Sequence, residues 1–168
     1  MQLTDWGNEE RIDIREWLSL DNKQVPTKKG LSLPLQRWKS LCLFFEDIEC
    51  ALNNKSSWKT HLGGNVIAQV SPKFPGRVDI RQHFLPEGAQ EIIPTKKGVN
   101  ISTEQFQHLV SAKTRLEQKF PWIKDIKPCF LQEDHTRLGV LKCSECTPNP
   151  EKYSAPWKQP NSNGNGLE

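Results

Sequence analysis

The chain has 168 residues, of which 35% are hydrophobic and 26% are charged, and its formal net charge is +3. These values are typical of a water-soluble globular protein that is long enough to bury a core without disulfides. They exclude a helical membrane protein, since no apolar run approaches the ~18 residues that a spanning helix needs, and so small a net charge does not by itself indicate a nucleic-acid partner. An odd number of cysteines, five, and an N-terminus without the basic and apolar parts of a secretory signal predict reduced cysteines inside the cell.

One sequence pattern occurs twice in the chain. Ile-Asp-Ile-Arg at residues 12–15 returns as Val-Asp-Ile-Arg at 78–81, and Pro-Thr-Lys-Lys-Gly at 26–30 returns unchanged at 94–98. The apolar positions that follow each glycine also match in the same order. These matches indicate that a unit of about 66 to 68 residues is duplicated, with a loop of variable length between the arginine and the proline.

The first copy begins with alternating apolar and polar residues over 11–17, which predict a half-buried strand. A turn is expected at 21–22, and the Lys-Lys-Gly sequence opens a second short strand over 31–33. Pro34 suits the first turn of a helix. The apolar stripe of this helix runs without interruption to Leu52, so we expect one amphipathic helix.

The second copy has the same elements and one more strand before them. Val66–Val70 lies in this additional strand-like segment, which spans residues 62–71. Strands over 77–84 and 99–101 then flank a turn at residues 86–88. Ser102 and Gln105 have the spacing of a capping box, which predicts the start of the second helix.

The C-terminal part is read as a strand hairpin followed by a tail. Residues 129–131 and 138–143 are strand-like, and such a hairpin would supply a sheet strand that the first copy lacks. The chain is therefore expected to be α+β, and it divides into a first repeat lacking its first strand or strands (1–56), a second repeat (57–122), a hairpin completing the sheet (123–147) and a disordered tail (148–168).

The repeated residues resemble a known family of proteins. Ile-Asp-Ile-Arg-Glu, then Pro-x-Lys-Lys-Gly-Leu-Ser-Leu, then Gln-x-Trp-x-x-Leu is similar to the C-terminal domain of the transcriptional coactivator family called positive cofactor four, which is related to the whirly-type fold. The resemblance covers residues 11–53 and 62–119. It implies a curved antiparallel sheet followed by a helix, with two such units pairing through their helices, here as an intramolecular pseudo-dimer.

The resemblance also implies a function and a location. Family members bind single-stranded DNA, or the strands of melted duplex, across the sheet face, so single-stranded DNA is the expected partner. Duplex DNA, RNA and the transcription machinery are further candidate partners, and the process would be transcription or DNA repair or replication in the nucleus. No nucleophile and base recur in a catalytic arrangement, so we expect neither an enzyme nor a cofactor. The alternative is a protein interaction module built on the same tandem fold.

Binding a single strand without reading its sequence requires cations along the phosphate track and flat rings for the bases. Strand alternation places Arg15 with Trp17, and Arg81 with His83, on one sheet face. The candidate nucleic-acid-binding residues are Arg15, Trp17, Lys28, Lys29, Lys73, Arg77, Arg81, His83, Phe84, Lys96 and Lys97.

The stacking role of Trp17 has an alternative, and so does the role of two aspartates near the arginines. The resemblance implies a stacking aromatic residue at the position of Phe84, and the same position in the first copy is Leu18. The neighbouring Trp17 could therefore stack on a base only if the strand shifts or bulges. Trp17 could instead be a packing residue. Asp13 and Asp79 each precede an arginine by two residues on the same face, which favours an ion pair over a catalytic pair of carboxylates.

The remaining motif is a group of cysteines near the C-terminus. Cys129, His135, Cys143 and Cys146 could ligate zinc, but a single Cys-x-x-Cys in this spacing matches no structural class of zinc site that we can name. Reduced cysteines at a strand end are the favoured interpretation, and no metal is expected.

Overall fold

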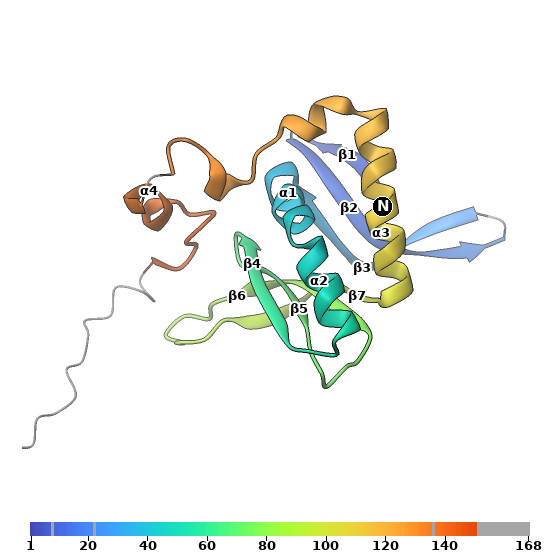
Figure 1. Cartoon of the computed structure of the whole chain (residues 1–168), viewed down its shortest axis with the longest axis horizontal. Coiled ribbons are helices and arrows are strands. Elements are labelled where there is room, and N and C mark those ends of the chain that lie inside the picture. The colour runs from blue at the N-terminus through green and yellow to red at the C-terminus, as the bar shows by residue number, and fades with distance from the viewer. Residues whose placement is uncertain (8, 22, 136, 151–168) are drawn as a thin grey trace, which may run out of the picture.

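The computed structural model describes residues 1–7, 9–21, 23–135 and 137–150. Most of the expected tail, from residue 151 on, lies outside the described residues. The described part of the chain forms two antiparallel sheets with helices packed on them, which confirms the α+β class and is consistent with two repeats (Figure 1). None of the helices in this part is long and apolar enough to cross a membrane.

The first sheet has three strands in the order β1 (Gln2–Trp6), β2 (Glu9–Leu20) and β3 (Lys23–Pro34). The alternation that predicted the strand at 11–17 gives β2 a buried inner row that includes Ile12 and Ile14. Their partners across the ladder, Leu33 and Leu31, are also buried. Both strands continue well beyond the predicted short segments, because their outer ends pair with each other as an exposed ribbon.

The second sheet has four strands in the order β4 (Trp58–Gly63), β5 (Val66–Val70), β6 (Arg77–Phe84) and β7 (Ile93–Ser102). The expected additional strand before the second copy is therefore present, and it is a hairpin of two strands, β4 and β5. The buried residues of this sheet include Val66 and Ala68 of β5 and Val78 and Ile80 of β6. Along β6, Val78 and Ile80 alternate with half-exposed or exposed residues.

The single helix expected after Pro34 is instead two helices, α1 (Leu35–Leu43) and α2 (Phe45–Asn53). The chain turns at Phe44, which lets two adjacent aromatic rings point to different partners. Phe44 packs against Trp58 with ring centroids 5.8 Å apart, whereas Phe45 meets Trp38 and, at 5.4 Å, Phe106. An uninterrupted apolar stripe does not reveal such a break, because both helices continue the stripe.

The second helix, α3 (Thr103–Lys119), begins as predicted with a capping box. The backbone N–H of Gln105 donates to Ser102 Oγ at 3.2 Å, and the backbone N–H of Ser102 donates to Gln105 Oε1 at 2.9 Å. Phe106 is fully buried on the inner face of α3, as the helical spacing of the apolar residues predicts.

Helices of the two repeats pack against each other, and one continuous core results. Figure 1 shows α3 running alongside α1 and α2, and Phe45 of α2 contacts Phe106 of α3 edge to face. Gln107 donates to Glu49 at 2.8 Å, and Lys39 lies 3.3 Å from Glu117. The buried hydrophobic residues of both sheets and of all three helices, with the exception of Ile67, belong to a single cluster.

The predicted C-terminal strand hairpin is wrong. Residues 121–142 form two short 3-10 helices, η1 (Pro121–Asp125) and η2 (Cys129–Leu131), and one α-helix, α4 (Arg137–Lys142). Periodicity cannot distinguish a short buried strand from a short helix, and the extra strand of the first sheet is supplied by β1 instead.

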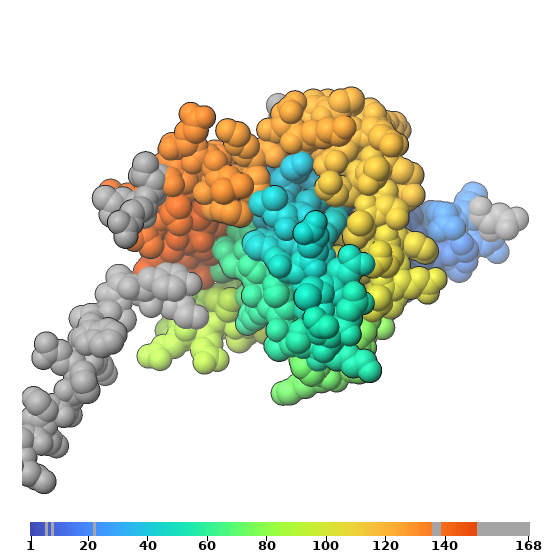
Figure 2. All heavy atoms as spheres, viewed as in Figure 1, coloured from blue at the N-terminus to red at the C-terminus, as the bar shows by residue number. Residues whose placement is uncertain are grey.

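The segment after η1 packs against the rest of the molecule, where Figure 2 shows it in orange and red beside residues coloured green and cyan. The backbone N–H of Gly64, in the β4–β5 turn, donates to Glu145 O at 2.7 Å. Thr147 is buried and donates to Val140 O at 2.8 Å, and Asn149 donates to Asn65 at 2.8 Å. Residues 148–150, which we expected to begin the disordered tail, therefore include a contact with the β4–β5 turn.

Glu117 provides a pH-dependent link between α3 and α1. Burial alone would raise the pKa of its carboxyl, but the ammonium groups of Lys113 and Lys39, 3.2 and 3.3 Å away, hold that pKa below its usual value. Because the folded-state pKa is depressed, this stabilisation is complete above the unfolded-state pKa, about 4.3, and is lost as the pH falls through the folded-state value.

We therefore expect Glu117→Gln to lower the free energy of unfolding by about 1–3 kcal/mol at pH 7, since a charged hydrogen-bond acceptor is lost. Urea unfolding of both proteins at several pH values measures this difference. It should shrink as the pH falls below about 4, and a difference that stays constant between pH 7 and pH 3 would contradict the ion pair.

Candidate nucleic-acid interface

The Thr-Lys-Lys sequence lies in a bulge of the first sheet. Arg15 of β2 pairs with Gly30 of β3, and Trp17 pairs with Pro26, so residues 27–29 lie opposite Glu16 alone. Such extra residues interrupt the ladder and bend the strand locally. The register of the ladder shifts between Arg15 and Trp17, which is the kind of shift that we required for Trp17 to stack on a base.

The second sheet has the same bulge at the matched position. Arg81 pairs with Gly98 and His83 pairs with Pro94, so residues 95–97 lie opposite Gln82 alone. The five identical residues in the two copies therefore adopt the same strand pairing in both sheets.

An arginine holds each bulge in place by donating to an aspartate carboxylate and to a threonine backbone carbonyl, an arrangement that we call the arginine clamp. In the first sheet, Arg15 donates to both carboxylate oxygens of Asp13 at 2.9 and 3.0 Å and to Thr27 O at 2.6 Å. In the second, Arg81 donates to Asp79 at 2.7 to 3.2 Å and to Thr95 O at 2.9 Å. The expected ion pairs are confirmed, and each also fixes the first residue of its bulge.

Both arginines of the clamp keep their charge. The hydrogen bond with Asp13 raises the pKa of Arg15 more than partial burial lowers it, and Asp79 does the same for Arg81. The arginine side chains remain 27% and 23% exposed. Each guanidinium is thus largely occupied within the protein and offers only its outer edge to a ligand.

The glycine that ends each Lys-Lys pair leaves room for the arginine to cross the neighbouring strand. A Cβ added at Gly30 would lie 3.0 Å from two carbons of the Arg15 side chain. At Gly98 it would lie 2.8 Å from the backbone oxygen of Ile80 and 2.9 Å from Arg81 Cγ. Close packing therefore requires glycine at position 98, whereas a Cβ at position 30 would press only on the flexible Arg15 side chain; neither glycine has a positive φ.

The lysines of each bulge point away from the core. Lys28, Lys29, Lys96 and Lys97 are all exposed, and the threonine hydroxyls fix their backbone by accepting from the amides of Lys29 and Lys97 at 3.1 Å. Lys29 also lies 3.3 Å from Glu16, although both side chains are open to solvent, where such pairs contribute little.

A groove of about 920 Å³ runs between the two sheets and α3. Trp17, half-buried, contributes an aromatic ring to its wall. Glu16 contributes an acidic side chain, whereas the basic side chains of the wall come from both repeats and are Arg15, Lys29, Arg77, Arg81, Lys96 and Arg115. The groove thus combines cations with a flat ring, which suits a polyanion carrying bases.

The groove brings together six of the eleven residues predicted from the sequence, namely Arg15, Trp17, Lys29, Arg77, Arg81 and Lys96. Lys28 and Lys97 lie beside it in the same bulges, and Lys73 is exposed in the turn between β5 and β6. Phe84 is 47% exposed but lies at the outer end of β6, opposite Ile93, and does not line the groove.

Of the predicted residues, His83 is the one that the structure buries. It is only 7% exposed, and its ring lies 3.1 Å from the backbone oxygen of Arg81, so it offers little surface to a ligand. Burial also lowers the pKa of His83, which favours the neutral ring. Simple alternation placed it beside Arg81, but the ladder shifts register between these two residues.

Sequence reasoning missed the contribution of α3 to the groove. Gln105, His108, Ala112 and Arg115 all line it. They recur at helical spacing, so they form one face of α3, which borders the apolar stripe at Leu109, another residue that lines the groove. This second face was readable in the sequence, but nothing there indicated that it would meet the sheets.

Comparisons with known proteins agree with the first copy of the pattern. Residues 1–43 match the family model described as Transcriptional Coactivator p15 (PC4). Over 56 residues the chain is 41% identical to the RNA polymerase II transcriptional coactivator KIWI from Arabidopsis thaliana. That alignment takes in 33% of this chain and 52% of the relative, so the chain spans about half the length of the curated relative it matches. No solved structure matches the chain.

The two glycines provide a test of the clamp geometry. Gly98→Ala should lower the free energy of unfolding by about 1–3 kcal/mol, because the backbone oxygen of Ile80 cannot easily move away from the new methyl group. Gly30→Ala should cost less, since the nearest atoms belong to the flexible Arg15 side chain. Urea unfolding compares the two variants, and an equal or smaller loss for Gly98→Ala would contradict this packing.

Proposed function

We propose that the chain is a non-enzymatic protein that binds single-stranded DNA, or the separated strands of melted duplex, in the groove between its two sheets. The observation that carries this proposal is the composition of the groove, where basic side chains from both repeats surround Trp17. Phosphates would meet the lysines of the bulges, which are exposed and held in position, and a base would stack on Trp17.

The lysines and arginines have different roles in this proposal. The guanidinium groups of Arg15 and Arg81 are committed to aspartate and to a backbone carbonyl, so they hold the bulges and offer little to a phosphate. Lysine is a compact charge on a flexible stem and suits contacts that follow a backbone without reading sequence. Such binding should weaken steeply with salt, because each phosphate contact releases counterions.

The proposed setting follows from the comparisons. The matched family model and the Arabidopsis relative are both described as transcriptional coactivators. We therefore propose a nuclear role in transcription, with components of the transcription machinery as protein partners. We also propose that the second copy arose by duplication, so that a pair of coactivator-like units is carried by one chain, as the matched bulges and the shared core support.

Changing the four bulge lysines together tests the site. The variant with Lys28, Lys29, Lys96 and Lys97 replaced by alanine should bind a labelled oligothymidylate with a Kd raised at least about tenfold, and its salt dependence should weaken by up to about 0.7 in log–log slope per lysine lost. Fluorescence anisotropy at two salt concentrations measures both quantities. The fold should be intact, because all four side chains are exposed.

A matched control removes the same charge elsewhere. The control variant has alanine in place of four exposed lysines that do not line the groove, Lys55, Lys119, Lys124 and Lys127. This control should keep the wild-type affinity.

Unchanged affinity of the bulge variant at low salt would refute the site. A different outcome would favour the protein interaction module, namely that the wild-type protein shows no salt-dependent binding to oligothymidylate, duplex DNA or RNA.

A further inference from the structure

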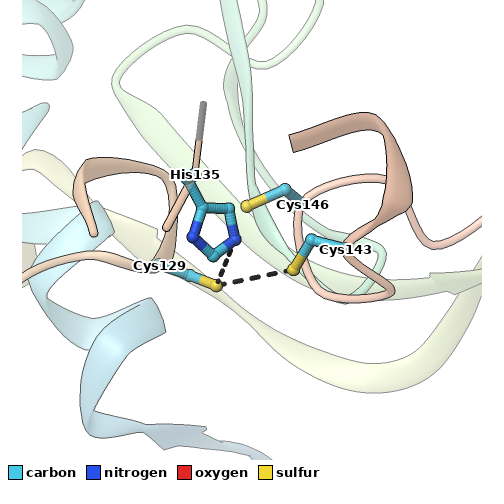
Figure 3. A group of neighbouring side chains, drawn as sticks. All are labelled: Cys129, His135, Cys143 and Cys146. Carbon is cyan, nitrogen blue, oxygen red and sulfur yellow. Dashed lines mark hydrogen bonds between the residues drawn. The ribbon is translucent and has the colours of Figure 1, made fainter. Parts of the chain in front are cut away.

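Four potential metal ligands come together outside the groove, in the C-terminal segment. Cys129 belongs to η2, His135 precedes α4, and Cys143 and Cys146 lie in the turn that follows α4. Their ligand atoms all lie within 4.8 Å of one another, and Figure 3 shows the three sulfurs and the imidazole facing a common centre. The sequence favoured reduced cysteines at a strand end, but no strand is present in this segment among the described residues.

The distances within the cluster are those of a metal site. Cys129 Sγ lies 3.7 Å from Cys143 Sγ and 3.5 Å from His135 Nε2. A tetrahedral zinc ion with its usual bonds to sulfur and nitrogen holds two sulfurs about 3.8 Å apart and a sulfur and a nitrogen about 3.5 Å apart. A disulfide would require about 2.05 Å between the sulfurs, and all five cysteines are free.

We propose that Cys129, His135, Cys143 and Cys146 bind one zinc ion as a closed, structural site. Three thiolates and one imidazole in a tetrahedral arrangement favour zinc over magnesium or calcium, which prefer oxygen ligands. All four positions of the ion are filled by protein atoms, so no position is open for water or substrate. On binding, zinc displaces the thiol protons, which pass to solvent.

Groups around the cluster orient its ligands. His135 directs Nε2 at the cluster, while its Nδ1 lies 3.0 Å from a carboxylate oxygen of Asp134. A metal-bound histidine commonly donates its second N–H to such an acceptor, which fixes the ring and its tautomer. Thus the histidine is already held in a ligating geometry.

A zinc ion would hold together a C-terminal segment that has little hydrophobic core of its own. The described residues between 121 and 150 form short helical elements only, and Ile123 is the one among them that belongs to the main core. They attach to α1 and the β4–β5 turn through an Arg37–Glu145 ion pair, in which Arg37 Nη2 lies 2.6 Å from Glu145 Oε2, and through the bond between Gly64 and Glu145. Zinc would close this segment into a small module, with Glu145 between two of its ligands as the anchor.

Metal content tests the proposal directly and does not depend on nucleic-acid binding. Full-length protein purified under reducing conditions, without chelator, should contain about one zinc per chain by elemental mass spectrometry. Replacing zinc with cobalt should give the intense visible bands of a tetrahedral ion and sulfur-to-cobalt charge-transfer absorption. Cys143→Ser should abolish both signals, whereas the matched control Cys50→Ser, at an exposed cysteine of α2, should keep them.

A second measurement covers the case in which Cys143→Ser fails to fold. Chelator added to wild-type protein should release the zinc and raise the protease sensitivity of residues 121–150 while the two sheets keep their circular dichroism. Wild-type protein that is free of zinc and gives no cobalt bands under reducing conditions would overturn the proposal. A disulfide between Cys129 and Cys143 in protein isolated under reducing conditions, or equal metal loss in Cys50→Ser, would also overturn it.

Discussion

The arginine clamp is the interaction that positions the two lysine-bearing bulges beside the groove. Asp13 with Arg15, and Asp79 with Arg81, tie one strand to a backbone carbonyl of the next and so hold each bulge in a fixed position. An ion pair at a fully exposed site would contribute little, but these carboxylates are largely buried. The clamp therefore explains the repeated motif as a unit, since the aspartate, arginine, threonine and glycine all serve to present two lysines.

The pairing of the two repeats has a different physical basis, which is the burial of aromatic side chains between helices. Phe45 and Phe106 meet edge to face, and the core continues from one sheet to the other through them. This contact joins the helices of the two copies, while β3 and β7 also contact each other directly. Arg15 and Arg81 come from equivalent positions in the two copies and line the same groove.

The sequence predicted features that depend on local spacing. Alternation gave the strands around Ile12 and Ile80, and Ser102 with Gln105 gave the start of α3. The sequence could not predict the break between α1 and α2 at Phe44, because the apolar stripe continues across that break. Residues 129–131 and 138–143 were predicted as strands because short apolar runs do not distinguish strand from helix. The groove and the cysteine cluster depend on contacts between distant segments, so spacing indicated their members but not their assembly.

The central claim, that the two bulges and Trp17 form one nucleic-acid interface, is tested most directly by mapping backbone amide chemical shifts while an oligothymidylate is added to the full chain. If the two bulges and Trp17 form one interface, the largest changes at low salt should cluster at residues 15–17, 27–30 and 95–98 and titrate together, because both sheets face the same groove. Changes that fall mainly on other surfaces, or that are confined to one of the two sheets, would contradict it.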